Sequence, residues 1–251
     1  MYQFFVQPEQ IQGKTVRITG SDVNHIKNVL RMKPGEEISV SNGADGREYR
    51  CGIESLEEDE ILCSLRFIKE EGLELPARIW LFQGLPKGDK MELIVQKAVE
   101  LGAYAVVPFS AKRSVVRLDQ KKAEKKRERW QAVAKGAAEQ SGRGIIPEVH
   151  PLKSFNEALD MAADLDVTLI PYEREEGMDG MIRAVRKIRP GQSAGVFIGP
   201  EGGFEEEEVR KAIEQGALPV SLGKRILRTE TAGLAMLSIL MYHLECESHI
   251  L

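Results

Sequence analysis

The pattern of hydrophobic residues changes near Gly72–Pro76, and this change constrains the fold more than any other feature of the chain. Before it, short strand-like runs are separated by turn sequences such as Asn42-Gly43-Ala44-Asp45-Gly46. After it, apolar runs of strand length alternate with helical stretches, which is typical of a parallel or mostly parallel sheet covered on both faces. We therefore expect an α/β protein with a small β domain, divided into a β-barrel-like domain at residues 1–72 and an α/β domain at residues 73–251.

The same patterns predict the individual elements. In the first domain we expect one helix at Asp22–Leu30, limited by Pro34, and strands at Tyr2–Val6, Thr15–Ile18, Glu37–Ser41, Tyr49–Ser55 and Ile61–Ile68. In the second domain we expect strands at Ile79–Gln83, Ala105–Phe109, Val167–Pro171, Ala194–Ile198 and Pro219–Leu222. The helices between them are predicted at Lys90–Leu101, Gln120–Gln140, Phe155–Ala163, Met178–Lys187, Glu205–Gly216 and Thr231–Leu244.

Composition limits the class of protein. With 42% hydrophobic and 29% charged residues, the chain has the balance of a globular protein that can bury a core. Its start lacks a targeting pattern, and the longest apolar run, Ala232–Tyr242, is shorter than the roughly 20 residues that span a membrane. The three cysteines and four histidines lack metal-ligand spacing. We expect a cytoplasmic protein without a membrane segment, disulfide framework or metal site.

One segment is strongly basic. Between Lys112 and Arg129, nine basic residues face three acidic ones, a local net charge of +6 in a chain whose total is −4. Such clusters bind phosphate groups, although a charge-rich helix is also often only a solvated face. Trp130, at its end, either stacks on a nucleotide or packs in the core. The candidates for nucleic-acid contact are Lys112, Arg113, Arg117, Lys121 and Lys122.

A glycine-containing loop follows the predicted strand Ala194–Ile198. It reads Gly199-Pro200-Glu201-Gly202-Gly203-Phe204 and leads into four consecutive glutamates, Glu205–Glu208. Ligands of open α/β sheets bind at the carboxyl ends of strands. Carboxylates in the first helical turn disfavour a phosphate there, and no phosphate-binding glycine motif is present. A cationic or zwitterionic ligand such as S-adenosylmethionine suits the loop better, while a simple turn is the structural alternative.

A second loop, Leu222–Ala232, also follows a predicted strand. It reads Leu-Gly-Lys-Arg-Ile-Leu-Arg-Thr-Glu-Thr-Ala and mixes three cations with apolar residues. Thr229 can cap the last helix. That helix is apolar nearly all round, so we expect it to be buried, partly against another subunit.

Together these motifs resemble the SPOUT superfamily of knotted methyltransferases, and more narrowly the uridine-N3 methyltransferases of small-subunit ribosomal RNA. The resemblance covers nearly the whole chain. One position departs from the family pattern, because Gln3 stands where an arginine usually precedes two aromatic residues. The matching segments are Ile198–Phe204, Leu222–Ala232, His25–Arg31, Lys87–Gly102 and Glu139–Arg143.

The resemblance implies an N-terminal PUA-like RNA-binding barrel and a C-terminal SPOUT domain tied in a trefoil knot. It implies a homodimer that uses S-adenosylmethionine to methylate N3 of a uridine in 16S ribosomal RNA, within the small (30S) subunit. The expected cofactor-binding residues lie in three loops: Leu169, Ile170, Ile198, Gly199, Pro200, Gly202, Gly203, Leu222, Gly223, Ile226, Leu227, Thr229 and Ala232.

For catalysis, we expect Arg228, and Arg225 second, to stabilise charge on the uracil oxygens. Glu201 either takes the N3 proton or holds the loop and the cofactor's ammonium. His25 and Arg31 are further candidates for RNA contact. Two other functions stay open at this point: a non-catalytic RNA-binding protein, and a SPOUT methyltransferase that acts on transfer RNA or on another ribosomal position.

Overall fold

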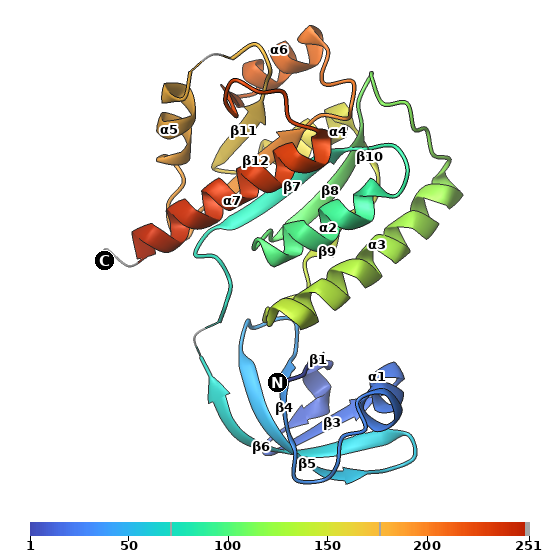
Figure 1. The fold of residues 1–251 in the computed structure, drawn as a ribbon. Helices are drawn as coiled ribbons and strands as arrows, with labels where there is room; N and C mark the ends of the chain where they lie inside the picture. Colours follow the sequence, from blue (N-terminus) through green and yellow to red (C-terminus); the bar gives the residue numbers. More distant parts are fainter. Residues whose placement is uncertain (71, 176, 249–251) are drawn as a thin grey trace. The chain divides into compact units, whose positions relative to one another are not determined.

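The computed structural model describes residues 1–70, 72–175 and 177–248. The chain divides into two compact units (Figure 1). The first unit holds Met1–Glu74 together with Ala138–Ile146, and the second holds Leu75–Ala137 together with Pro147–Leu251. The change of pattern near Gly72–Pro76 thus coincides with the boundary between the units.

The first unit is built on a six-stranded sheet of order β1-β4-β5-β6-β3-β2. The β1–β4 pair is parallel and the other pairs are antiparallel. Alternation along β3 buries Val16 and Ile18 and exposes the residues between them, which places the core on one face of the strand. The strands are β1 Gln3–Phe5, β2 Ile11–Gln12, β3 Thr15–Thr19, β4 Glu37–Ser41, β5 Glu48–Leu56 and β6 Glu60–Lys69, with a short 3₁₀ turn, η1, at Pro8–Gln10.

The helix predicted at Asp22–Leu30 is interrupted. It begins as α1, Ser21–Asn24, and continues as a wide π turn, η2, His25–Val29. The wide turn is closed by the N–H of Leu30, which donates to the carbonyl of His25 at 2.9 Å. Burial of Ile26 holds this turn against the sheet.

A later segment of the chain completes the first unit. The predicted domain range 73–251 includes Ala138–Ile146, whereas the structure groups this segment with the first unit. The side chain of Gln3 donates to the carbonyl of Arg143 at 2.5 Å, and the guanidinium of Arg143 forms an ion pair with Glu74. Gln3 is only 9% exposed, so in this chain its amide serves the fold of the first unit.

The second unit contains a seven-stranded sheet of order β10-β8-β7-β12-β11-β13, with β9 on β8. Every recorded strand pair of this sheet is parallel, which confirms the predicted sheet type. The two-residue strands β9 and β10 were not predicted, because two residues show no periodicity. The bounds are β7 Arg78–Gly84, β8 Ala105–Ser110, β9 Glu148–Val149, β10 Lys153–Ser154, β11 Val167–Pro171, β12 Ser193–Ile198 and β13 Leu218–Val220.

Helices cover this sheet in two layers (Figure 1). On one side, α7 packs on β7, β12 and α2. On the other, α4 and α6 close a core in which Phe82, Phe109 and Phe197 meet Phe155 and Phe204. The helices are α2 Lys90–Glu100, α3 Gln120–Ser141, α4 Phe155–Ala162, α5 Asp179–Val185, α6 Glu206–Glu214 and α7 Thr229–Ser248.

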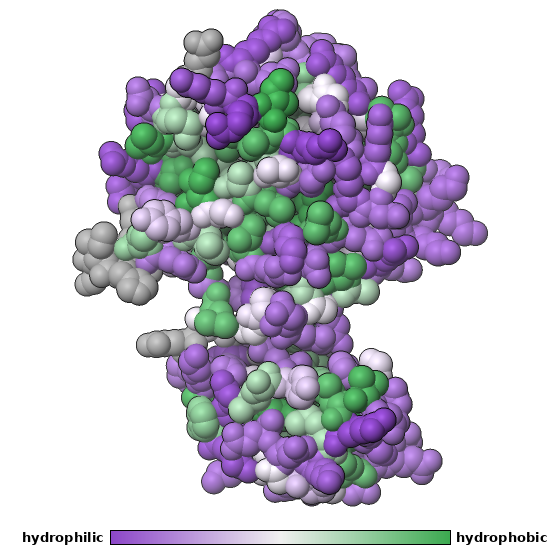
Figure 2. Space-filling view, viewed as in Figure 1, coloured by the Kyte–Doolittle hydropathy of each residue, from purple (hydrophilic) through white to green (hydrophobic). Residues whose placement is uncertain are grey.

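Apolar side chains also gather on the outer surface over α2 and α7 (Figure 2). Leu93 and Tyr242 are 45% and 71% exposed there. Trp130 of α3, by contrast, is 3% exposed and packs in the core, so its indole is not a free stacking surface. Among the described residues, no helix is long and apolar enough to cross a membrane.

Candidate functional site

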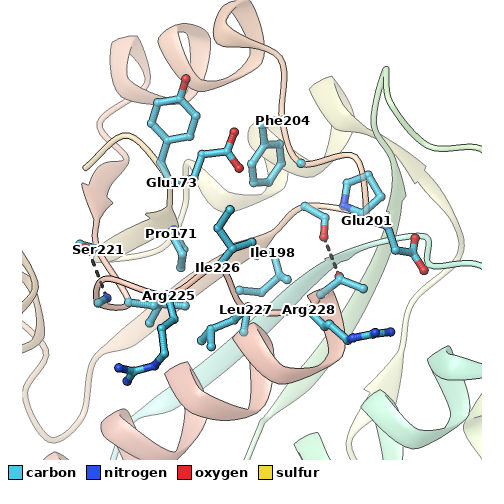
Figure 3. Close-up of a pocket in the computed structure, with 18 of the residues that line it drawn as sticks. Pro171, Glu173, Ile198, Glu201, Phe204, Ser221, Arg225, Ile226, Leu227 and Arg228 are labelled. Carbon is cyan, nitrogen blue, oxygen red and sulfur yellow. Dashed lines mark hydrogen bonds between the residues drawn. The ribbon is translucent and has the colours of Figure 1, made fainter. Parts of the chain in front are cut away.

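A cavity of about 350 Å³ opens at the carboxyl ends of β11, β12 and β13 (Figure 3). Its walls come from the segments that follow these three strands, as expected for a parallel sheet. Its volume lies within the range of small-molecule sites. The lining residues are Lys90, Pro171–Glu173, Ile198–Glu201, Gly203, Phe204, Ser221–Thr229 and Ala232.

The loop after β12 is packed tightly on the end of β7. A Cβ atom at Gly84 would lie 2.7 Å from the backbone nitrogen of Pro200, so the two backbones meet without a side chain between them. Gly203 has φ +67, a conformation that favours glycine. The hydroxyl of Thr229, at the start of α7, donates to the carbonyl of Gly199 at 2.6 Å. The two predicted loops therefore meet directly in the cavity wall.

Lys90, the first residue of α2, connects both loops. Its ammonium lies 3.1 Å from a carboxylate oxygen of Glu201 and 3.1 Å from one of Glu230. These hydrogen bonds raise the pKa of Lys90. Lys90 was missed as a site residue, although it lies in the Lys87–Gly102 segment on which the family resemblance partly rests.

Glu201 is held by three donors. Its carboxylate accepts hydrogen bonds from the N–H of Lys87, at 3.0 Å, and from Lys90. Burial acts to raise the pKa of Glu201, but hydrogen bonds from its own backbone N–H, from Lys87 and from Lys90 outweigh burial and lower the pKa below its ordinary value. The group is thus an ionised anchor of the loop and a poor proton acceptor at neutral pH.

The N-terminus of α6 is capped by the protein itself. Glu208 is 5% exposed, and its carboxylate accepts hydrogen bonds from the N–H groups of Glu205 (2.9 Å) and Lys112 (2.9 Å). The Glu205 side chain completes a capping box. A phosphate would meet these carboxylates rather than free N–H groups, which argues against a phosphate cradle at this helix.

Arg225 and Arg228 are exposed and line the cavity. In Figure 3 their guanidinium groups point in different directions, with Arg228 on the side of the view where Glu201 lies. Ile226, between them, lines the cavity and is 90% exposed. Cations thus stand at the mouth of the cavity around an accessible apolar residue.

Some predicted cofactor residues do not line the cavity. Leu169 and Ile170 are fully buried in β11, and the cavity wall is formed instead by the next residues, Pro171–Glu173. Gly202 is exposed but is not among the lining residues, and its carbonyl accepts a hydrogen bond from the guanidinium of Arg113 at 3.2 Å.

The basic segment is partly neutralised by ion pairs. The ammonium of Lys112 pairs with Glu205 and Glu207, and that of Lys122 pairs with Asp119. Further along α3, Arg127 and Arg129 pair with Glu124 and Glu92. Arg117 and Lys121 are exposed, and so are His25 and Arg31 in the first unit.

No group of three or more histidine, cysteine, aspartate or glutamate residues is arranged to hold a metal ion in the ranges 1–70, 72–175 and 177–248.

Two family models match the chain. A model described as RNA methyltransferase domain matches residues 73–241, and one described as RNA methyltransferase PUA domain matches residues 18–66. The two-part organisation, with a PUA-like unit before an α/β methyltransferase unit, is thereby confirmed.

Individual relatives match along most of their length. The ribosomal RNA small subunit methyltransferase E of Bacillus subtilis (strain 168) is 44% identical over 98% of this chain and 98% of its own. The protein of that name from Synechocystis sp. is 32% identical over 92% of this chain and 74% of its own. A crystal structure of the Neisseria gonorrhoeae protein of that name, bound to S-adenosyl methionine, is 35% identical, with a TM-score of 0.84 over 96% of this chain and 97% of that one. The chain therefore belongs to the RNA methyltransferase family that contains the ribosomal RNA small subunit methyltransferase E proteins.

Proposed function

We propose that this protein transfers a methyl group from S-adenosylmethionine to N3 of a uridine in 16S ribosomal RNA of the small subunit. The observation that carries the proposal is the cavity itself. The cavity is lined by both the Ile198–Phe204 loop and the Leu222–Ala232 loop. A relative whose structure matches this chain with a TM-score of 0.84 was crystallised with S-adenosyl methionine.

The residues of the cavity fit this cofactor. Tightly packed glycine loops offer backbone groups to an adenosine, while carboxylates and cations on the wall suit a zwitterionic methionine moiety. The capped N-terminus of α6 leaves no phosphate position beside it. When bound, S-adenosylmethionine supplies an electrophilic methyl group on its sulfonium.

The protein's own contribution is to position uracil and stabilise its anion. Uracil N3 is a weakly acidic imide nitrogen that becomes nucleophilic when it loses its proton to solvent water, with the negative charge spreading to O2 and O4. Arg228 supplies fixed donors for these oxygens at the cavity mouth, with Arg225 second. We assign Glu201 to holding the loop, because its lowered pKa makes it a weak base.

The RNA reaches the cavity with the target base unpaired or extruded, because a Watson–Crick pair occupies N3. Of the five candidates in the basic segment, Arg113, Arg117 and Lys121 are better able to meet phosphates than Lys112 and Lys122, which first have to leave carboxylates. The PUA-like unit holds flanking RNA, with His25 and Arg31 as contact candidates.

We further propose that the second unit is knotted and that two copies form a homodimer. After β13, at the edge of the sheet, the chain returns to place α7 on β7 and β12, and Thr229 binds the loop after β12 on the way. This return path supports a trefoil knot. The homodimer is supported by the exposed apolar surface of α2 and α7, which a second copy of the chain would bury (Figure 2).

The test is incubation of the purified protein with labelled S-adenosylmethionine and small ribosomal subunits that lack the modification, followed by nucleoside analysis. We expect 3-methyluridine with the wild type and its loss with Arg228→Ala. Methylation of another base or another RNA would keep the chemistry and change the substrate. Failure to bind S-adenosylmethionine would favour a non-catalytic RNA-binding protein.

A further inference from the structure

Gln83 is a fully buried polar side chain near the carboxyl end of β7. Its Nε2 donates to the carbonyl of Gly84 at 3.0 Å and to the hydroxyl of Thr229 at 2.9 Å. Its Oε1 is buried and accepts no hydrogen bond from the described residues. An unsatisfied amide oxygen destabilises a core, so packing alone does not favour glutamine at this position.

The bond to Thr229 extends into the cavity wall. The Thr229 hydroxyl, which accepts from Gln83, donates to the carbonyl of Gly199 at 2.6 Å. One chain of hydrogen bonds thus connects three segments that are far apart in sequence: the end of β7, the start of α7 and the loop after β12. Thr229 and Gly199 line the cavity, whereas Gln83 lies behind them.

The donor from Gln83 determines which way the Thr229 hydroxyl points. A hydroxyl has one proton and can rotate to suit its neighbours. When Nε2 of Gln83 occupies a lone pair, the Thr229 proton is directed to Gly199.

We propose that Gln83 is a positioning residue for methyl transfer: through Thr229 it sets the position of the Gly199 carbonyl and of the first turn of α7. Arg228 directly precedes Thr229, so the same chain of hydrogen bonds also orients the arginine assigned to the uracil oxygens. This inference rests on the proposed function, since it assumes that S-adenosylmethionine occupies the cavity.

The first test is Gln83→Met, which removes the donor with little change in volume. S-adenosylmethionine affinity is measured by calorimetry, kcat and KM by methylation of small subunits, and stability by thermal unfolding. We expect the dissociation constant to rise about tenfold, as for loss of the buried hydrogen bond to Thr229. Tm should change little, because methionine removes the unsatisfied oxygen together with the two donated hydrogen bonds. Gln215→Met, at an exposed glutamine directly after α6, is the matched control and should change neither the dissociation constant nor Tm.

The second test uses Thr229. Thr229→Val keeps the shape and removes the hydroxyl, whereas Thr229→Ser keeps the hydroxyl. We expect the valine variant to lose cofactor affinity like Gln83→Met and the serine variant to retain it. The Gln83→Met/Thr229→Val double variant should bind the cofactor no more weakly than Thr229→Val alone, because both residues act through the same chain of hydrogen bonds.

Two results would overturn the proposal. One is wild-type cofactor affinity and turnover in Gln83→Met. The other is loss of affinity only in proportion to a lowered Tm, with independent effects of the two substitutions, which would make Gln83 a residue of the fold alone. If the wild type itself does not bind S-adenosylmethionine, the proposed function fails instead.

Discussion

The ammonium of Lys90 lies 3.1 Å from Oε1 of Glu201, a residue 111 positions later in the chain. Together with Glu230, this contact ties the first turn of α2 to the loop after β12 and to the start of α7. The three side chains are 18–30% exposed, so they are partly screened by solvent.

Lys90→Met should weaken cofactor binding modestly, about threefold to tenfold, because it frees two carboxylates beside the cavity. The loss should shrink at high salt, which already screens the pairs in the wild type. Calorimetry at two ionic strengths measures both effects. Lys97→Met, which breaks a pair with Glu100 within α2, is the control. Equal weakening by both variants would contradict a specific role for Lys90.

Glu201→Gln should lower kcat by less than tenfold, whereas removal of a general base costs about 10²–10⁴ in rate. The reason is that the carboxylate is already bound to the Lys87 N–H and the Lys90 ammonium. Single-turnover methylation with saturating cofactor isolates the chemical step. A loss of more than a hundredfold there, with unchanged cofactor affinity, would restore Glu201 as the base.

The same contacts predict how the loop responds to acid. The folded-state pKa values of Glu201 and Glu230 are lowered from 4.5, so their stabilising contribution is present above that pH and is lost as pH falls through the folded-state values. Both carboxylates should stay ionised between about pH 6 and 8, because pH 6 already lies about 1.5 pH units above the ordinary glutamate pKa. Cofactor affinity should therefore not change with the ionisation of these groups in that range, and it should fall in acid. The Glu201→Gln variant should show a smaller fall. An equal acid response in both proteins would contradict the assignment.

Glu208→Ala should destabilise the fold by about 1–3 kcal/mol, because it removes a helix cap and leaves two part-buried N–H groups without their acceptor. The affected groups are the N–H of Glu205 and that of Lys112. Urea unfolding gives the free energy. Glu207→Ala is the matched control in the same turn, since its carboxylate is 65% exposed and should contribute little.

Arg117→Gln should weaken RNA binding and reduce the slope of log K against log salt by about 0.7–0.9, as expected for one lost phosphate contact. Lys112→Gln should have a smaller effect on both, because the Lys112 ammonium is paired with Glu205 and Glu207. Binding to a ribosomal RNA fragment over a salt series measures both slopes. The reverse order of the two variants would show that Lys112 leaves its carboxylates on binding.

Tyr242→Glu should convert a dimer to a monomer at micromolar concentration. Tyr242 is 71% exposed on α7, within the apolar surface of α2 and α7, and a buried unpaired carboxylate opposes association. Light scattering during gel filtration gives the mass. A wild type that is monomeric under the same conditions would contradict the homodimer.

Local pattern determined a large part of this protein. Continuous apolar runs predicted the parallel sheet, because strands covered on both faces carry no polar alternation. The two loops that meet at the cavity were identified from their glycines, cations and place after strands. The width of the turn at His25–Val29 and the two-residue strands were not predicted, because such short features leave no period in a sequence.

Only the tertiary structure decided which side chains meet. Gln83 looks like the end of an apolar strand until Thr229, 146 residues later, is brought against it. By sequence Lys112 is a candidate phosphate-binding cation, but the N-cap and first turn of α6 place two carboxylates beside it. Residues 138–146 comprise the end of α3 and the segment after it, and yet they complete the first unit. Periodicity reports which face of an element is buried, whereas hydrogen-bond partners and net local charge depend on segments that the fold brings together from distant parts of the chain.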